Sequence, residues 1–314
     1  MSYLVGLWAS GAAGGLMLRA ITEHPELELA GVVTADPRRA GLAATEDPAG
    51  LLARRPHVIC YTGGSADDLR LMLQAGASVV SNAVPELVDP ASADPVLVRR
   101  LRSACATGGS ACLTIGPGMV GDVLPVLLSG VCRSVDGITV TEFRTSPDGG
   151  FGGPIGRRPP VVRAGAPGRK WGPVVRLLAR HLAVPLDGIA EAHEVCAAPE
   201  EIDGPCGPIG KGTLAGLRYR VSGMLRRRPV ITVERVVRAR GDLAPHWPAP
   251  PLGGPGHRVE IAGEPPVRMD LAAPGGSHAA ALRMVNAVRA VAEAPPGLHT
   301  PLDLPVFSGR RLLR

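Results

Sequence analysis

The feature that most constrains the fold is the alternation of short apolar runs with amphipathic segments over the first 116 residues. The apolar runs consist mainly of Val, Ile, Leu and Cys, and they occupy residues 3–8, 27–33, 57–62, 78–83 and 111–116. The segments between them have helical periodicity, at residues 14–24, 47–54, 65–76 and 94–107. Strands that alternate with helices at this spacing form a parallel sheet with right-handed crossovers, and uninterrupted apolar strands indicate a sheet covered on both faces. The sequence therefore predicts a doubly wound α/β domain.

The pattern changes after residue 122. A helix at 121–131 and a strand at 136–143 lead into a loop at 146–170 that is rich in Gly, Pro and Arg, and a helix follows at 172–183. The later strands alternate polar and apolar residues, at 188–197, 213–224, 229–239, 257–262 and 266–272. Such alternation is typical of an open, largely antiparallel sheet with one packed and one solvated face. An amphipathic helix at 277–297, ending at Pro295-Pro296, is expected to return to the first domain.

The stretch VGLWASGAAGGLMLRAI, residues 5–21, has the form of a dinucleotide-binding turn between a strand and a helix. Ala9, Gly11 and Gly14 take the places of the three glycines that allow the bend, the approach of the pyrophosphate and close helix–strand packing. Phosphate would lie on the N–H groups at the helix N-terminus, where the helix dipole favours negative charge. A strand–turn–helix without a ligand is the alternative. The candidate cofactor-binding residues in this turn are Ala9, Ser10, Gly11, Ala12, Ala13 and Gly14.

The end of the second strand bears on the choice of nucleotide. NAD enzymes place an acidic residue there to hold the ribose hydroxyls, whereas Asp36, the only acid here, lies a few residues beyond the strand. Thr34, Arg38 and Arg39 could instead receive a 2′-phosphate, so NADPH is expected in preference to NADH. The alternative is that both arginines are solvated. Further candidates for cofactor contact follow the other strands of the sheet, at Tyr61, Thr62, Gly63, Asn82, Gly116 and Pro117.

Composition and charge argue against several other classes of protein. The formal net charge is +6, but all the basic residues except Lys170 and Lys211 are arginines. The densest run, Arg226–Arg228, precedes Pro229 in an expected hairpin turn without an aromatic platform, so no nucleic-acid partner is expected. Residues 103–121 are uncharged, but their five glycines make a poor membrane span. The N-terminus has no signal-peptide pattern, so we expect neither membrane nor secretion.

The sequence also lacks the usual patterns of metal and nucleophile sites. The six cysteines form no C-x-x-C pair, which suits free thiols in a reducing cytoplasm better than disulfides or zinc. His193 and Glu194 lie on an expected strand rather than in an H-E-x-x-H helix, so no metal site is expected. No serine stands in a G-x-S-x-G elbow.

Several longer stretches carry a family resemblance: LRAITEHPELELAGV after the glycine turn, GPGMVGDVLPVLLSGVC (116–132), GTLAGLRYRVSGM (212–224), RPVITVERV (228–236), HRVEIAGEPPVRMDL (257–271) and APPGLHTPLDLP (294–305). The chain resembles the 2,4-diaminopentanoate dehydrogenases and native amine dehydrogenases, which are relatives of dihydrodipicolinate reductase. The resemblance implies an NAD(P)-dependent homodimer that interconverts an amine and a carbonyl through an imine. Hydride is delivered to the imine carbon. The small-molecule partners would be an amine, imine or ketone and, for amination, ammonium.

The change of pattern after residue 122 also predicts a domain organisation. It indicates an N-terminal Rossmann domain at residues 1–120, completed by 277–314. Residues 121–276 would form an α+β domain with an open, mostly antiparallel sheet, responsible for substrate binding and dimerisation.

Glu86 is the candidate catalytic residue. The family carries a glutamate just after the strand that ends near the nicotinamide, and VVSNAVPELVDP (79–90) occupies that segment here. A carboxylate at this place could orient ammonia or an amine, move a proton, or stabilise a developing iminium charge. The alternative is an ordinary surface acid in a loop. Phe143 and Thr145 are the substrate-binding candidates, next to the 144–170 loop that helps to shape the substrate pocket in relatives.

Departures from the family keep other functions open. The stretch between Arg39 and Thr45 is short, and Gly116 stands where relatives often have Asn or His. The His-His and Lys signature of dihydrodipicolinate reductases is absent. The expected function is that of an amine dehydrogenase or imine reductase of a specialised metabolic pathway. The alternatives are a carbonyl or hydroxy-acid dehydrogenase on the same scaffold, and a non-catalytic NADP-binding sensor or scaffold protein.

Overall fold

The computed structural model describes residues 2–9, 11–34, 44–45, 47–116, 119–144, 155–156, 166–204, 207–250, 253–272 and 277–312. The chain divides into two compact units. One consists of Met1–Gly118 with Gly276–Arg314, and the other of Met119–Gly275. The C-terminal segment therefore belongs to the same unit as the N-terminal strands.

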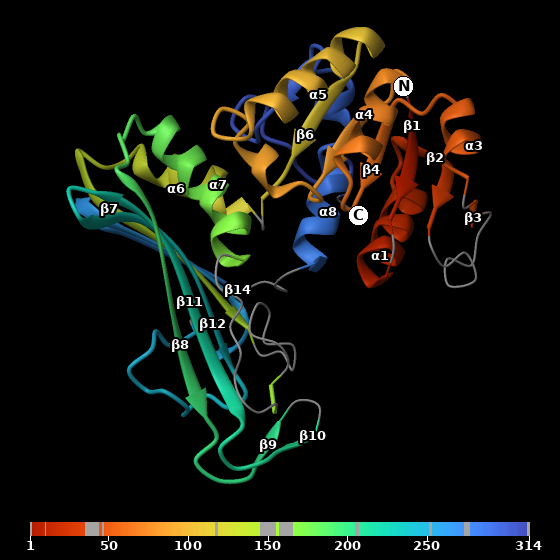
Figure 1. Cartoon of the computed structure of the whole chain (residues 1–314). Helices are drawn as coiled ribbons and strands as arrows, with labels where there is room; N and C mark the ends of the chain where they lie inside the picture. The colour runs from red at the N-terminus through yellow and green to blue at the C-terminus, as the bar shows by residue number, and fades with distance from the viewer. Residues whose placement is uncertain are drawn as a thin grey trace. The chain divides into compact units, whose positions relative to one another are not determined.

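The sheet of the first unit is parallel throughout (Figure 1). Its seven strands lie in the order β15-β6-β5-β4-β1-β2-β3. They are β1 (Tyr3–Trp8), β2 (Leu27–Val33), β3 (Ala44–Thr45), β4 (Val58–Tyr61), β5 (Ser78–Ser81), β6 (Ala111–Thr114) and β15 (Gly297–His299). The strand order runs outward in opposite directions from β1 and β4, which is the defining property of a doubly wound sheet. The predicted fold class is confirmed for this unit.

Helices cover both faces of this sheet. One face packs against α1 (Gly11–Glu23), α8 (Ser277–Asn286) and α9 (Val288–Ala292), and the other against α3 (Pro48–Ala53), α4 (Ala66–Gln74) and α5 (Pro95–Gly108). Side chains of a strand alternate between the two layers, so Cys60 belongs to the α1 side and Ile59 to the α4 side. Because both layers are apolar, the strands are apolar without alternation.

Local signals explain where α4 begins and ends. The Ser65 side chain accepts hydrogen bonds from the backbone N–H groups of Asp67 and Asp68, at 3.1 and 3.3 Å, so it is the predicted N-cap. Gly76, just beyond the helix, has a φ of +88°, a conformation that glycine adopts without strain.

Two helix predictions need correction. The helix expected over 277–297 is interrupted at Ala287 and ends at Ala292, and Gly297–His299 forms β15, which pairs with β6. Pro295 and Pro296 cannot continue a helix, and the following residues gain backbone partners on the sheet edge. The helix expected from residue 172 begins at Ala166 instead, because Gly172 and Pro173 are accommodated inside it rather than before it.

The sheet of the second unit is mixed and mostly antiparallel. Its strands lie in the order β14-β13-β7-β12-β11-β8, and only the central β7–β12 pair is parallel. They are β7 (Ser134–Arg144), β8 (Gly188–Ala197), β11 (Leu214–Leu225), β12 (Arg228–Arg238), β13 (Gly256–Glu264) and β14 (Val267–Ala272). A separate two-stranded sheet pairs β9 (Ile202–Gly204) with β10 (Gly207–Ile209). This sheet confirms the α+β part of the predicted fold class.

Helix α7 (Ala166–His181) covers one face of the six-stranded sheet, and α6 (Val123–Ser129) precedes β7. A side chain at Gly223 on β11 would meet Val175 of α7, which shows how closely the helix approaches the strand. The β11–β12 hairpin turns through Arg226 and Arg227, whose φ values of 51° and 63° are those of a two-residue type I′ turn. The basic run is therefore in a hairpin turn, as predicted.

Candidate functional site

The glycine turn leaves β1 at the point where the strand order reverses. The Ala9 backbone N–H donates to the Val33 carbonyl oxygen of β2, at 3.1 Å, and Thr62 N–H donates to the Trp8 carbonyl oxygen, at 3.0 Å. These bonds hold the ends of β2 and β4 on either side of the turn. In doubly wound sheets, ligands bind in the crevice outside the carboxyl ends of the strands at this reversal.

Ala9 is compatible with the turn. It is 6% exposed, and it is not among the described residues with positive φ, so a methyl group in place of the usual glycine causes no backbone strain. A Cβ added at Gly14 would lie 3.4 Å from the Cβ of Ala9. A Cβ at Gly14 would thus lie in van der Waals contact with the Ala9 methyl group, so α1 lies close to the end of the strand. Ser10 lies outside the described residues.

The first turn of α1 is suited to a phosphate. The helix begins at Gly11, so the backbone N–H groups of its first turn have no acceptor within the helix. No acidic side chain occupies this turn to compete for them. Thr34, directly after β2, is 8% exposed, while Arg38 and Arg39 lie outside the described residues. The cofactor turn itself fits the group that the sequence predicts.

Tyr61, the last residue of β4, has its side chain in the apolar core of the first unit. The Tyr61 side chain is fully buried, 5.5 Å from the Trp8 ring in an edge-on arrangement. Its hydroxyl donates to Asp68 Oδ2 at 2.7 Å and accepts from the Ser65 N–H at 3.0 Å. Burial and then the bond to Asp68 raise the pKa of Tyr61 to about 12. The Tyr61 ring thus anchors the start of α4.

The segment after β5 carries two candidate site residues, Asn82 and Glu86, and both are exposed. Ser81 Oγ accepts a hydrogen bond from the Ala83 N–H at 2.9 Å, a turn that leaves Asn82 exposed. A short 3₁₀ helix, η1 (Pro85–Val88), follows. Leu87 and Val88 are each 1% exposed, so they fix this helix to the unit while Glu86 faces solvent. Among the described residues, none forms a hydrogen bond or ion pair with the Glu86 carboxylate.

The carboxyl ends of β4, β5 and β6 lie in sequence along the same edge. The Ile115 N–H donates to the Ser81 carbonyl oxygen at 2.8 Å, which continues the β5–β6 pairing one residue beyond the end of β6. Gly116 follows as a buried residue, and Pro117 lies outside the described part. The structure therefore brings Ala9, Thr62, Asn82 and Gly116 to one edge of one sheet, with Glu86 just beyond it.

Of the two substrate-binding candidates, only Phe143 is described. It is 2% exposed and packs with Val236, Ala244 and Trp247. The Arg258 guanidinium lies 5.4 Å from its ring centre. These contacts give Phe143 a packing role within the second unit. Thr145 lies outside the described residues.

A buried charged row in the second unit was not predicted. Strand register places Arg235 of β12, Glu142 of β7 and His257 of β13 side by side on the face covered by α7. Arg235 Nε donates to Glu142 Oε2 at 2.8 Å. Burial acts to raise the pKa of Glu142, but Arg235 and then His257 outweigh it and bring that pKa below its ordinary value. One sequence pattern could have indicated its burial. In ITVTEF, Glu142 lies on the same face of the strand as the apolar residues Ile138 and Val140.

The described residues contain no cluster of His, Cys, Asp or Glu able to hold a metal ion. Five described cysteines are free thiols, and burial raises the pKa of Cys60 to about 12 and that of Cys105 to about 11. Within the described ranges, no helix has the length and apolar character needed to cross a membrane.

Comparison with known proteins decides the family. A family model for the 2,4-diaminopentanoate dehydrogenase C-terminal domain matches residues 171–310. An amine dehydrogenase from Streptomyces virginiae is 32% identical over 343 aligned positions, which cover 96% of this chain and 95% of the relative. The chain belongs to the amine dehydrogenase family. The 2,4-diaminopentanoate dehydrogenase of Acetoanaerobium sticklandii is 24% identical over 276 positions, covering 78% of this chain and 71% of that protein.

The fold of this amine dehydrogenase family member has a solved counterpart. The structure of an amine dehydrogenase from Mycobacterium smegmatis matches with a TM-score of 0.76 at 19% identity, over 98% of this chain and 97% of that one. Family membership confirms the resemblance drawn from the sequence. It also confirms the expectation of a nicotinamide-dependent oxidoreductase that acts on CH–NH₂ groups.

Proposed function

We propose that the chain is an NADP-preferring amine dehydrogenase that forms an amine from a carbonyl compound and ammonia through an imine, and catalyses the reverse reaction. The observation that supports this proposal is that the candidate residues lie along one edge of the parallel sheet. The Ala9–Gly14 turn lies there at the reversal of strand order, and Glu86 follows β5 along the same edge. The same site would serve as an imine reductase if the imine is supplied from solution.

The preference for NADPH rests on the residues after β2. Thr34 lies at the strand end, and the following segment carries Arg38 and Arg39 rather than an acid at the strand terminus. A 2′-phosphate bound by such groups gains charge-assisted hydrogen bonds, each contributing about 1.5–3 kcal/mol. Loss of one bond of this strength corresponds to roughly tenfold or more in affinity.

Glu86 is proposed as the proton carrier. Its carboxylate would accept a proton from the ammonia or amine nitrogen as that nitrogen attacks the carbonyl carbon. The proton would then pass to the hydroxyl group of the addition product, so that water leaves and the C=N bond forms. The carboxylate charge would also stabilise the iminium ion. A bound nicotinamide cofactor supplies the hydride that reduces the imine carbon.

The first experiment is a carbonyl panel assayed with NADPH or NADH, in the presence and absence of ammonium. We expect coenzyme oxidation that requires ammonium, with a Kd for NADPH at least tenfold lower than that for NADH, measured by quenching of tryptophan fluorescence. Trp8 directly precedes the turn and is a suitable reporter. Turnover without ammonium would instead favour a carbonyl or hydroxy-acid dehydrogenase. Coenzyme binding without turnover on any amine or ketone would favour a sensor protein.

We also propose a homodimer in the cytoplasm. The sheet face opposite α7 has a shallow depression that includes Arg218, Arg220 and Glu234. Both of its arginines are already paired, Arg218 with Glu234 at 2.8 Å and Arg220 with Glu194 at 2.8 Å, so a second copy could cover them without burying an unpaired arginine. Sedimentation equilibrium should give about twice the 32.4 kDa of one chain, and a single-chain mass would contradict the dimer. The free thiols support a reducing compartment.

A further inference from the structure

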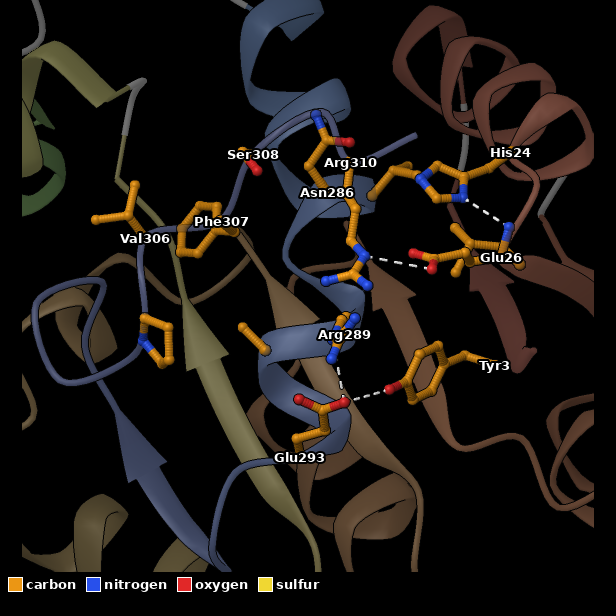
Figure 2. Close-up of a pocket in the computed structure, with 14 residues that line it drawn as sticks. Tyr3, His24, Glu26, Asn286, Arg289, Glu293, Val306, Phe307, Ser308 and Arg310 are labelled. Carbon is orange, nitrogen blue, oxygen red and sulfur yellow. Dashed lines mark hydrogen bonds and ion pairs between the residues drawn. The ribbon is translucent and has the colours of Figure 1, made fainter. Parts of the chain in front are cut away.

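A second cavity lies at the opposite edge of the parallel sheet, within the first unit (Figure 2). It has a volume of about 270 Å³ and is bounded by the start of β1, the α1–β2 turn, helices α8 and α9, and residues 305–310 of the C-terminal segment. Tyr3, at the start of β1, lines it, whereas the cofactor turn begins at Ala9. Six residues of extended chain span roughly 20 Å, so the two sites are separate.

Two arginines in this cavity contact their carboxylate partners through the Nε atom. Arg310 Nε lies 3.3 Å from Glu26 Oε1, and Arg289 Nε lies 3.1 Å from Glu293 Oε1. Figure 2 shows both guanidinium groups between these two acids. None of the described residues accepts a hydrogen bond from the terminal Nη atoms of either arginine. Each guanidinium therefore keeps its terminal donors available.

The Glu26 carboxylate is shared between two arginines. Arg311, which lies outside the lining, also reaches Glu26, with its Nε 3.3 Å from Oε1, so Glu26 does not serve Arg310 alone. Glu26 is 9% exposed and forms ion pairs with Arg310 and Arg311 of the C-terminal segment, which hold that segment against the cavity. Close guanidinium groups repel each other, and an anion placed between them would remove that repulsion.

The remaining lining supplies neutral donors and an apolar wall. His24 Nδ1 accepts the Glu26 N–H at 3.1 Å, so its other ring nitrogen, Nε2, is the one that carries hydrogen. Asn286 and Ser308 add an amide and a hydroxyl group. The apolar lining residues are Leu27, Val285, Ala290, Pro305, Val306 and Phe307. A few polar groups beside an apolar wall are typical of sites for small molecules, and the arginine, amide and hydroxyl donors here suit an anionic group.

We propose that this cavity is a binding site for a small oxyanion, a carboxylate or phosphate group, held by the terminal guanidinium nitrogens of Arg289 and Arg310. A ligand here joins α9 to the C-terminal segment and therefore stabilises the docked segment. The site is independent of the amine dehydrogenase reaction, since it lies at the edge of the sheet away from the cofactor turn.

Thermal unfolding of the full chain tests the proposal. We expect the melting temperature to rise in a saturable way with inorganic phosphate or with butyrate, relative to chloride at the same ionic strength, and calorimetry to give a Kd in the millimolar range or lower. Binding of phosphate alone, or of butyrate alone, identifies which group the site takes. No saturable binding of either anion up to about 50 mM would overturn the proposal.

Two substitutions and one control locate the binding. Asn286→Asp keeps the size of the side chain but adds a negative charge to the lining, and Arg289→Gln removes a guanidinium group; each should weaken anion binding at least tenfold. Arg311→Gln is the matched control, because Arg311 contacts the same Glu26 but is not part of the lining. Its Kd should stay within about threefold of that of the unmodified chain. Unchanged binding in folded Asn286→Asp protein would place the anion elsewhere, for example at the α1 N-terminus, and would refute the site.

Discussion

Replacing Glu86 with Gln should lower kcat for amine formation by about 10²–10³-fold, because the amide keeps the size of the side chain but cannot accept a proton. Stability should change little. Glu86 is exposed, and the buried neighbours Leu87 and Val88, not Glu86, hold η1 in place. The Kd for NADPH should remain within about twofold, since the proposed role is in proton transfer and not in nucleotide binding. Stopped-flow reduction of a ketone with ammonium measures the first quantity, and fluorescence titration the second.

Two further variants make the Glu86 result specific. Glu86→Asp keeps a carboxylate on a shorter chain and should retain more activity than the Gln variant. Glu28→Gln removes an exposed acid from β2 of the same unit and should leave kcat unchanged. If Glu86→Gln protein keeps more than half of the original kcat with an unchanged pH profile, Glu86 is an ordinary surface acid and the proton carrier is another group.

The first unit could be predicted well because its signals are local. Each strand is a short apolar run bounded by helix caps such as Ser65 and stop residues such as Gly76, and these act within a few residues of themselves. Strand β15 could not be predicted in the same way. It has three residues, and it pairs with β6, which lies nearly 190 residues earlier in the chain, so no local pattern specifies it.

The sequence predicts which residues lie at the strand ends that form the site. It does not predict where their side chains point. The sequence places Tyr61 at the carboxyl edge correctly, but it cannot show that the ring turns back into the core to bind Asp68. The Glu142–Arg235–His257 row depends on the register of three strands that are distant in sequence, so only the buried phase of Glu142 was visible. Nonlocal register and rotamer choice are the two properties that a pattern of residue types does not encode.

The largest expected loss of stability comes from Gly63→Ala. A Cβ at Gly63 would lie 2.5 Å from Cζ of the Tyr61 ring, well inside van der Waals contact. The ring cannot yield easily, because it is fully buried and its hydroxyl bonds Asp68 and Ser65. Overpacking of this kind costs about 1–3 kcal/mol, and displacement of the hydroxyl adds about 1 kcal/mol for each lost hydrogen bond. We therefore expect the free energy of unfolding to fall by about 2–4 kcal/mol, measured by urea denaturation.

The neighbouring glycine provides a matched control for this prediction. A Cβ at Gly64 would have no atom within 4 Å, and Gly64 is not among the described glycines with positive φ, so Gly64→Ala should change stability by less than about 0.5 kcal/mol. A double-mutant cycle with Tyr61→Leu then isolates the cause, because Gly63→Ala should cost much less once the ring is gone. Equal effects of the two glycine substitutions would mean that the Tyr61 ring moves freely. The anchoring of α4 through Asp68 would then have to be abandoned, and the Tyr61 hydroxyl would again be a candidate for cofactor contact.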